Sequence, residues 1–305
     1  MITFLLRRVA LMLPTLVVIA TLTFALVRLA PGGPFMSEKE IPAAARQELM
    51  HRYGLDRPLP QQYLAFLGNA ARLDFGPSYK YPDREVRDIL AQGFAVSAEL
   101  GGWALLLALL IGVPVGVIAA VKQNQTADFV AMTAALAGVS VPNFVLGPVL
   151  VLVFSLTLLW LPAALWTGPA SRVLPVLALS VSYIAYIARL TRAGMLEVLR
   201  QDYIRTARAK GLSERVVVLK HALKLGILPV VSYLGPAAAR IIMGSIVIEQ
   251  VFAIPGLGRY LVVGAVNRDY TLVLGVVLFY ASFLLALNLL VDVAYKALDP
   301  RVELA

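Results

Sequence analysis

The segment from Tyr203 to Leu212 carries the side chains best placed to do chemistry in this sequence. Its cations could pair with acidic groups on a partner protein or with anionic lipid, and Gly211 can adopt the positive φ that ends a helix. The spacing alone leaves both kinds of partner open. We expect a docking surface made of Tyr203, Arg205, Thr206, Ala207, Arg208, Ala209, Lys210, Gly211 and Leu212.

The sequence does not indicate catalysis. It contains no Gly-x4-Gly-Lys-Ser/Thr motif, so we expect no ATP binding through a P-loop. It has no cysteine, which excludes disulfides and thiolate metal sites. The two histidines, His51 and His221, fall on opposite sides of the membrane in the topology predicted below and cannot share a metal. We therefore expect no enzyme activity, no cofactor and no metal site in this chain.

The composition indicates a polytopic α-helical membrane protein. The chain has 305 residues, is 60% hydrophobic and 15% charged, and has a mean hydropathy of +0.80. Soluble domains are about half apolar and about a quarter charged. The apolar stretch after Arg7 and Arg8 is about nineteen residues long, longer than the core of a signal peptide, and predicts an uncleaved first span. The net charge of +9 follows the membrane topology, so no nucleic-acid partner is expected.

Six helical spans are predicted, each close to the thickness of a bilayer core. They cover residues 9–29, 98–121, 129–158, 173–193, 229–251 and 273–295. The third span contains Pro142 and Pro148, and we interpret it as one long, tilted, proline-kinked helix rather than two short spans. A split would put the basic loop, residues 194–228, outside the cell against the positive-inside rule. Both termini are then expected in the cytoplasm.

Three regions follow from these spans: residues 1–29 with the first helix, an external loop domain at 30–97, and a core at 98–305 that includes the basic loop. In the external domain we expect helices near 42–53, 60–73 and 83–94. A turn cluster at 74–79 separates the second from the third.

Two of the polar residues inside predicted spans could line a solute path. Arg240 must face the bundle interior or a watery cavity, where it could line a solute path or pair with Glu99 or Glu249. Asn143 could line the same path or form a contact between helices.

The basic loop resembles the EAA loop of the permease subunits of bacterial ABC importers. Residues 205–212, Arg-Thr-Ala-Arg-Ala-Lys-Gly-Leu, match the form found in the peptide and nickel branch throughout. Against the general pattern, Glu-Ala-Ala-x3-Gly-x9-Ile-x-Leu-Pro, the match is partial. Ala207, Gly211 and Leu223 are in register, the sequence departs at Arg205, Thr206, His221 and Lys224, and Leu228-Pro229 comes five residues late.

The resemblance extends along essentially the whole chain. It includes Leu29-Ala30-Pro31-Gly32, Ser140-Val141-Pro142-Asn143-Phe144, Ile254-Pro255-Gly256-Leu257-Gly258, Asn267-Arg268-Asp269-Tyr270 and Asp299-Pro300-Arg301. Residues 31–35 and 74–81 are most similar to the oligopeptide-transport permease encoded first in such operons.

This resemblance implies a type I ABC importer permease fold and a pore-forming subunit of a binding-protein-dependent oligopeptide importer in a bacterial inner membrane. The implied partners are a second, homologous permease subunit, two ATPase subunits, a periplasmic or lipid-anchored peptide-binding protein, the peptide itself and membrane lipid. The basic loop would couple the chain to an ATPase, with Arg205, Arg208 and Lys210 on that surface.

Two further expectations follow from the resemblance. Glu249, Pro255, Gly256 and Gly258 would lie near the docking face of the binding protein, although their spacing suits a plain re-entrant loop equally well. The alternatives for function are a nickel or dipeptide importer of the same family and a secondary transporter. The secondary transporter should carry paired intramembrane carboxylates and inverted repeats, and neither is visible. A membrane scaffold or receptor fits less well, because of the intramembrane Arg240 and the prolines.

Overall fold

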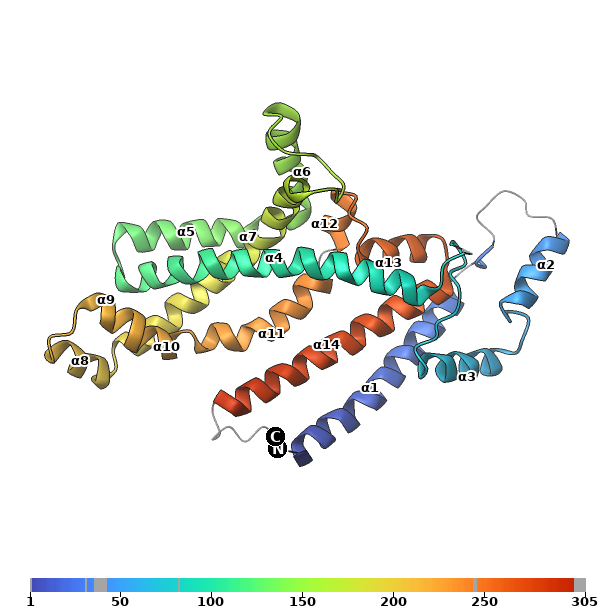
Figure 1. Ribbon diagram of the computed structural model, residues 1–305, viewed down its shortest axis with the longest axis horizontal. Coiled ribbons are helices and arrows are strands. Elements are labelled where there is room, and N and C mark those ends of the chain that lie inside the picture. Colours follow the sequence, from blue (N-terminus) through green and yellow to red (C-terminus); the bar gives the residue numbers. More distant parts are fainter. Residues whose placement is uncertain (1, 31, 36–42, 82, 244–245, 299–305) are drawn as a thin grey trace. The chain divides into compact units, whose positions relative to one another are not determined.

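The computed structural model describes residues 2–30, 32–35, 43–81, 83–243 and 246–298, and these are mostly helical (Figure 1). The first half of the chain forms α1 (Ile2–Leu29), α2 (Ala43–Arg52), α3 (Leu59–Ala70), α4 (Val86–Val121), α5 (Thr126–Ser140), α6 (Asn143–Leu150) and the π-helical turn η1 (Val151–Thr157). The second half forms α7 (Pro169–Leu199), α8 (Asp202–Ala209), α9 (Glu214–Val216), η2 (Val217–Ala222), α10 (Leu223–Gly226), α11 (Leu228–Met243), α12 (Ile246–Val251), α13 (Leu257–Val266) and α14 (Tyr270–Leu298). The expected all-α fold is confirmed.

Five segments of the described chain are long and apolar enough to cross a membrane, or six if one bent pair counts as a span. Apolar helices suit lipid because they satisfy their backbone hydrogen bonds internally. The five segments are Leu6–Leu29, Val86–Val121, Pro169–Leu199, Leu228–Val251 and Tyr270–Leu290. The second has 36 residues, or about 54 Å of helix, which exceeds the thickness of the bilayer core. Residues 86–94 are therefore the first turns of α4 and not the separate helix expected from the sequence.

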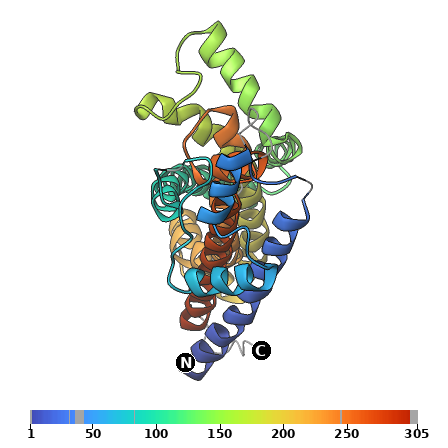
Figure 2. The same ribbon diagram turned by 90° about the vertical axis from the view of Figure 1, so that its right-hand side faces the viewer.

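The third predicted span is bent sharply instead of gently kinked. The segments Thr126–Ser140 and Asn143–Thr157 meet at an angle of 98°, and Figures 1 and 2 show α6 turned away from the line of α5. Val141 is extended and precedes Pro142, which caps the start of α6 at Asn143. A residue before proline is pushed out of the helical region, so the helix breaks at this point.

The chain divides into two compact units, and each is described by itself. The first comprises residues 1–97 and 255–289. In it α3 lies against α1, where Thr21 and Tyr63 share a hydrogen bond of 2.6 Å. The ring of Phe94, near the start of α4, contacts Phe279 and Phe283 of α14 at centroid distances of 5.0 Å.

Asp269 organises the polar part of this first unit. Its side chain is buried and caps α14 by accepting the backbone N–H of Leu272 at 3.1 Å. It also accepts the hydroxyl of Ser78 and the backbone N–H of Lys80, so the 74–81 turn is attached to the start of α14. Within the motif of residues 267–270, Asp269 therefore has a structural role.

The second unit comprises residues 98–254 and 290–305, of which the described part is built on close contact between α4, α5 and α7. A Cβ added to Gly116 of α4 would lie 2.5 Å from the carbonyl oxygen of Ala188 in α7, so only glycine allows this approach. Arg192 of α7 binds the buried carboxylate of Asp128 at the start of α5 through two hydrogen bonds of 2.6 and 2.7 Å. This bidentate pair fixes α5 against α7.

Candidate functional site

The tip of the basic loop is a helix that ends at a glycine turn. Gly211 has a φ of +77°, as predicted. The N–H of Gly211 donates to the carbonyl of Arg208, and the N–H of Leu212 donates to that of Ala207. This pair of bonds is the Schellman arrangement that closes a helix with a left-handed residue. No atom lies within 4 Å of where a Cβ would sit on Gly211, so the backbone angle alone requires glycine there.

The base of the loop is an apolar cluster within the second unit. It contains Ala120, Met195, Val198, Ile204, Ala207, Val217, Val218 and Ala222. An uninterrupted helix over residues 195–207 would place Met195, Leu199, Tyr203 and Ala207 on one apolar stripe, but the structure does not form that helix. The chain breaks at Arg200 and Gln201, which changes the helical phase. Ile204 is therefore fully buried, whereas Tyr203 is 40% exposed.

Arg208 and Glu214 form a clamp across the glycine turn. The guanidinium of Arg208 in α8 donates to both carboxylate oxygens of Glu214 in α9, at 2.6 and 3.1 Å. These hydrogen bonds lower the pKa of Glu214 and raise that of Arg208. The charge of Arg208 is thus satisfied within the loop. The sequence reasoning missed Glu214, although an acid at the first turn of the helix after Gly211 is a recognisable signal.

The rest of the tip presents a mixed apolar and basic surface. Tyr203, Leu212, Val216 and Leu219 are 38–52% exposed. Lys210 is exposed beside the turn, and Arg205 is exposed next to Asp202 at 3.4 Å. Of the nine residues predicted for this surface, Ala207 is buried in the base of the loop and the other eight are exposed.

Arg240 lies on an exposed part of α11 among tyrosines. It interacts electrostatically with Tyr183 of α7 and Tyr233 of α11. The rings of Tyr233 and Tyr186 are 4.5 Å apart, and Tyr186 is 43% exposed. Asn143, the other residue predicted for the path, is partly buried and accepts the hydroxyl of Ser182 in α7 at 3.0 Å. Asn143 therefore forms a contact between α6 and α7.

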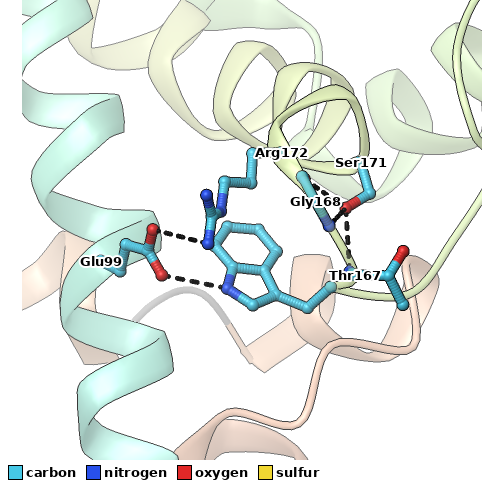
Figure 3. Close-up of polar contacts among 6 residues, drawn as sticks. Glu99, Thr167, Gly168, Ser171 and Arg172 are labelled. Carbon is cyan, nitrogen blue, oxygen red and sulfur yellow. Dashed lines mark hydrogen bonds and ion pairs between the residues drawn. The ribbon is translucent and has the colours of Figure 1, made fainter.

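Of the alternatives given for Arg240, the pairing with Glu99 is not formed, because Glu99 binds other partners (Figure 3). Arg172 lies 3.0 Å from one carboxylate oxygen of Glu99, and the indole N–H of Trp166 donates to the other at 3.1 Å. The Arg172 guanidinium also lies 5.3 Å from the Trp166 ring centre. Ser171 accepts the N–H groups of Thr167 and Gly168, so this cluster holds the loop before α7 against α4.

The four residues predicted to lie near a binding protein differ in exposure. Glu249 is fully buried, Gly256 and Gly258 are buried, and Pro255 is exposed. The N–H of Leu257 donates to Ser97 at 2.9 Å, which fixes the turn that contains the glycines. The exposed member of the set is therefore Pro255.

Two family models match the chain. One, the "binding-protein-dependent transport system inner membrane component", matches residues 112–304, and its N-terminal companion matches residues 1–78. The oligopeptide transport system permease protein OppB of Salmonella typhimurium is 48% identical over 305 residues, covering 99% of this chain and 100% of that protein. The dipeptide transport system permease protein DppB of Bacillus subtilis is 46% identical over 301 residues, covering 99% and 98%.

Solved structures agree on the fold. An inward-facing structure of the MetNI methionine ABC transporter aligns with a TM-score of 0.56 at 19% identity, covering 69% of this chain and 96% of that chain. An amino acid ABC transporter crystallised with histidines aligns at 0.55 and 17%, covering 69% and 94%. The chain therefore belongs to the family of binding-protein-dependent transport system inner membrane components, the multi-pass permeases of ABC importers, and has their type I fold.

Proposed function

We propose that this chain is one of two pore-forming subunits of an ATP-driven oligopeptide importer in a bacterial inner membrane. The observation that carries the proposal is the identity of 45–48% over the full length to permeases named for oligopeptide transport. The partners are a second, homologous permease, two ATPase subunits and a peptide-binding protein that is periplasmic or lipid-anchored. Both termini and the basic loop lie in the cytoplasm.

In this proposal the tip of the basic loop seats on an ATPase subunit. Its support is the rigid geometry of the tip, with the Gly211 turn, the Arg208–Glu214 clamp and an apolar base that ties the tip to α7. The exposed residues Tyr203, Lys210 and Leu212 form the contact surface. Arg208 does not contact the ATPase in this proposal. Its guanidinium binds Glu214 and so holds the contact surface in shape.

The solute path lies along α7 and α11 in this proposal. A path for peptides needs groups that can bind a carboxylate and amide backbone transiently, and Arg240 with its neighbouring tyrosines supplies them. The binding protein contacts the region of Pro255, and crosslinking from position 255 tests this assignment. Dipeptides are a second candidate substrate, favoured by the 46% identity to a dipeptide permease.

The experiment that tests the coupling role is a pair of substitutions at Gly211. We expect Gly211→Val to lower peptide uptake about tenfold, because a β-branched residue pays about 1–2 kcal/mol in the left-handed region. Gly211→Asn should retain most uptake, since asparagine tolerates this region. Uptake of a labelled peptide and co-purification of the ATPase subunits are measured together, with dipeptide and pentapeptide competitors. Normal uptake and normal ATPase retention in Gly211→Val would contradict the proposal.

A further inference from the structure

The first unit contains a cavity of about 390 Å³ between the end of α1, α3 and the start of α14. Its charged lining consists of three arginines, Arg28, Arg52 and Arg57, and one acid, Asp74. Its apolar lining includes the rings of Phe24 and Phe66, 6.0 Å apart. The cavity is thus cationic and aromatic, a combination that suits an anion attached to an apolar body.

Two polar side chains in this cavity have unused hydrogen-bonding groups. Arg28 is held by ring contacts, with its guanidinium 5.2 Å from the Phe24 ring centre and 4.8 Å from that of Tyr270. Its buried Nε has no hydrogen-bond partner among the described residues.

The amide of Gln62 is the second. It donates its N–H groups to the carbonyls of Leu55 and Arg57, while its buried Oε1 has no described partner. Buried polar atoms are normally satisfied, so these two await a donor and an acceptor from elsewhere. A neighbouring cavity of about 470 Å³ shares Arg28, Arg57, Gln62 and Tyr270 and widens the space around them.

The depth of the cavity indicates a membrane ligand. Tyr63 of α3 bonds to Thr21, eight residues before the end of α1 at Leu29, and eight residues of helix span about 12 Å. The α3 sequence, LPQQYLAFLGNA, contains no charge, and its Leu59 and Leu64 are 56% and 67% exposed. An uncharged helix at this depth beside an apolar span lies among lipid chains. Arg28, one residue before the end of the span, is then at the level of the headgroups.

We propose that this cavity binds a membrane phospholipid. The phosphate accepts hydrogen bonds from Arg28 and Arg57, a headgroup hydroxyl or ammonium donates to Oε1 of Gln62, and an acyl chain packs along Phe24 and Phe66. Each feature of the cavity matches a part of a phospholipid. The arginines match the phosphate, the unpaired amide oxygen matches a headgroup donor, and the two phenylalanine rings match an acyl chain. The site would fasten the external helices α2 and α3 to the bilayer beside α1.

The test uses the full chain with its co-purifying partners in nanodiscs of phosphatidylethanolamine and phosphatidylglycerol. A trace of phosphatidylglycerol with a diazirine in its acyl chain is photolysed, and crosslinked peptides are mapped by mass spectrometry. We expect crosslinks in residues 19–29 and 59–70. Arg28→Gln and Arg57→Gln should each lower the yield about tenfold, the value of a lost charged hydrogen bond.

Three comparisons make the result decisive. Arg28→Lys keeps the charge and should retain most of the yield, and Arg72→Gln removes an exposed arginine outside the cavity and should change nothing. If Arg28→Gln does not assemble, Arg57→Gln at the exposed rim decides alone. Unlabelled phosphatidylglycerol should compete, whereas trialanine should not. Absent crosslinks, equal yields in the arginine variants and Arg72→Gln, or displacement by trialanine would each overturn the proposal.

Discussion

At the scale of single residues, the basic side chains of the loop have two different roles. One holds the shape of the loop through an ion pair, and another is exposed on its surface. Arg205, Arg208 and Lys210 look alike in the sequence, yet Arg208 binds Glu214 through two of its nitrogens, whereas Lys210 is exposed at the turn. An exposed ion pair contributes little stability by itself. Its value here is geometric, because it fixes the angle between α8 and α9 on either side of Gly211.

We expect Arg208→Gln and Glu214→Gln each to lower peptide uptake, by at most about fivefold, the upper value of an exposed pair. The double variant should be no worse than either single one, and the exchange Arg208→Glu with Glu214→Arg should recover part of the loss. Uptake per assembled complex is the measurement. The control is Arg205→Gln, whose partner Asp202 lies on the same helix. Additive losses in the double variant would contradict a clamp.

The clamp also has a defined pH dependence. The pKa of Glu214 in the folded loop lies below its ordinary value of 4.5, because Arg208 hydrogen-bonds to the carboxylate. A depressed pKa contributes stability that is present above the ordinary value and is lost as the pH falls through the folded value. The clamp is therefore intact at neutral pH and opens only in acid below about 4.5.

At the scale of the elements, α4 and α7 approach so closely that small residues decide the contact. The Cβ of an alanine at Gly116 would lie 2.5 Å from both the Ala188 oxygen and the Thr191 Cβ. Small residues allow such close approaches between helices in membranes. There the hydrophobic effect does not drive helices together, and van der Waals packing stabilises their contact instead. This contact lies next to the apolar cluster at the base of the loop. The close packing of α4 against α7 therefore also fixes the position of the loop.

We expect Gly116→Ala to destabilise the protein by about 1–3 kcal/mol, the typical cost of overpacking. Gly102→Ala in the same helix is the matched control, because no atom lies within 4 Å of its Cβ position. That change should be neutral or stabilising by up to about 1 kcal/mol, since alanine is the better helix former. The midpoint of thermal unfolding in detergent measures both. Equal midpoints for the two variants would show that α4 and α7 do not meet as described.

At the scale of the whole molecule, function depends on which side of the membrane each segment occupies. The distribution of lysine and arginine predicts that the basic loop lies inside the cell and residues 30–97 outside. Because the sequence contains no cysteine, single cysteines can report on each side without background.

We expect Lys210→Cys to react with a membrane-impermeant maleimide only after cells are opened, and Arg72→Cys to react in intact cells. Both positions are exposed, so a failure to react is not due to burial. A third cysteine at Arg240 tests the solute path, because peptide should slow its labelling. Reaction of Lys210→Cys in intact cells would reverse the topology and remove the basis for ATPase coupling.

Much of the site could be predicted because its signals are local. The positive φ at Gly211 follows from glycine after a helix, and helices follow from apolar runs that must satisfy their own backbone in lipid. The helical phase across 195–207 could not be predicted, because the break at Arg200 and Gln201 has no proline or glycine to mark it. The 98° bend was underestimated for a related reason, since proline signals a break without giving its angle.

The sequence by itself determined the class of the protein, its family and the position of the loop turn. These depend on composition and on short motifs, which neighbouring residues in the chain specify. Only the tertiary structure decided which charges meet. Arg172 with Glu99 and Arg192 with Asp128 are pairs that depend on how the helices pack. A side chain's partner depends on distances in space, and separations of up to 73 positions along the sequence carry no local signal of them.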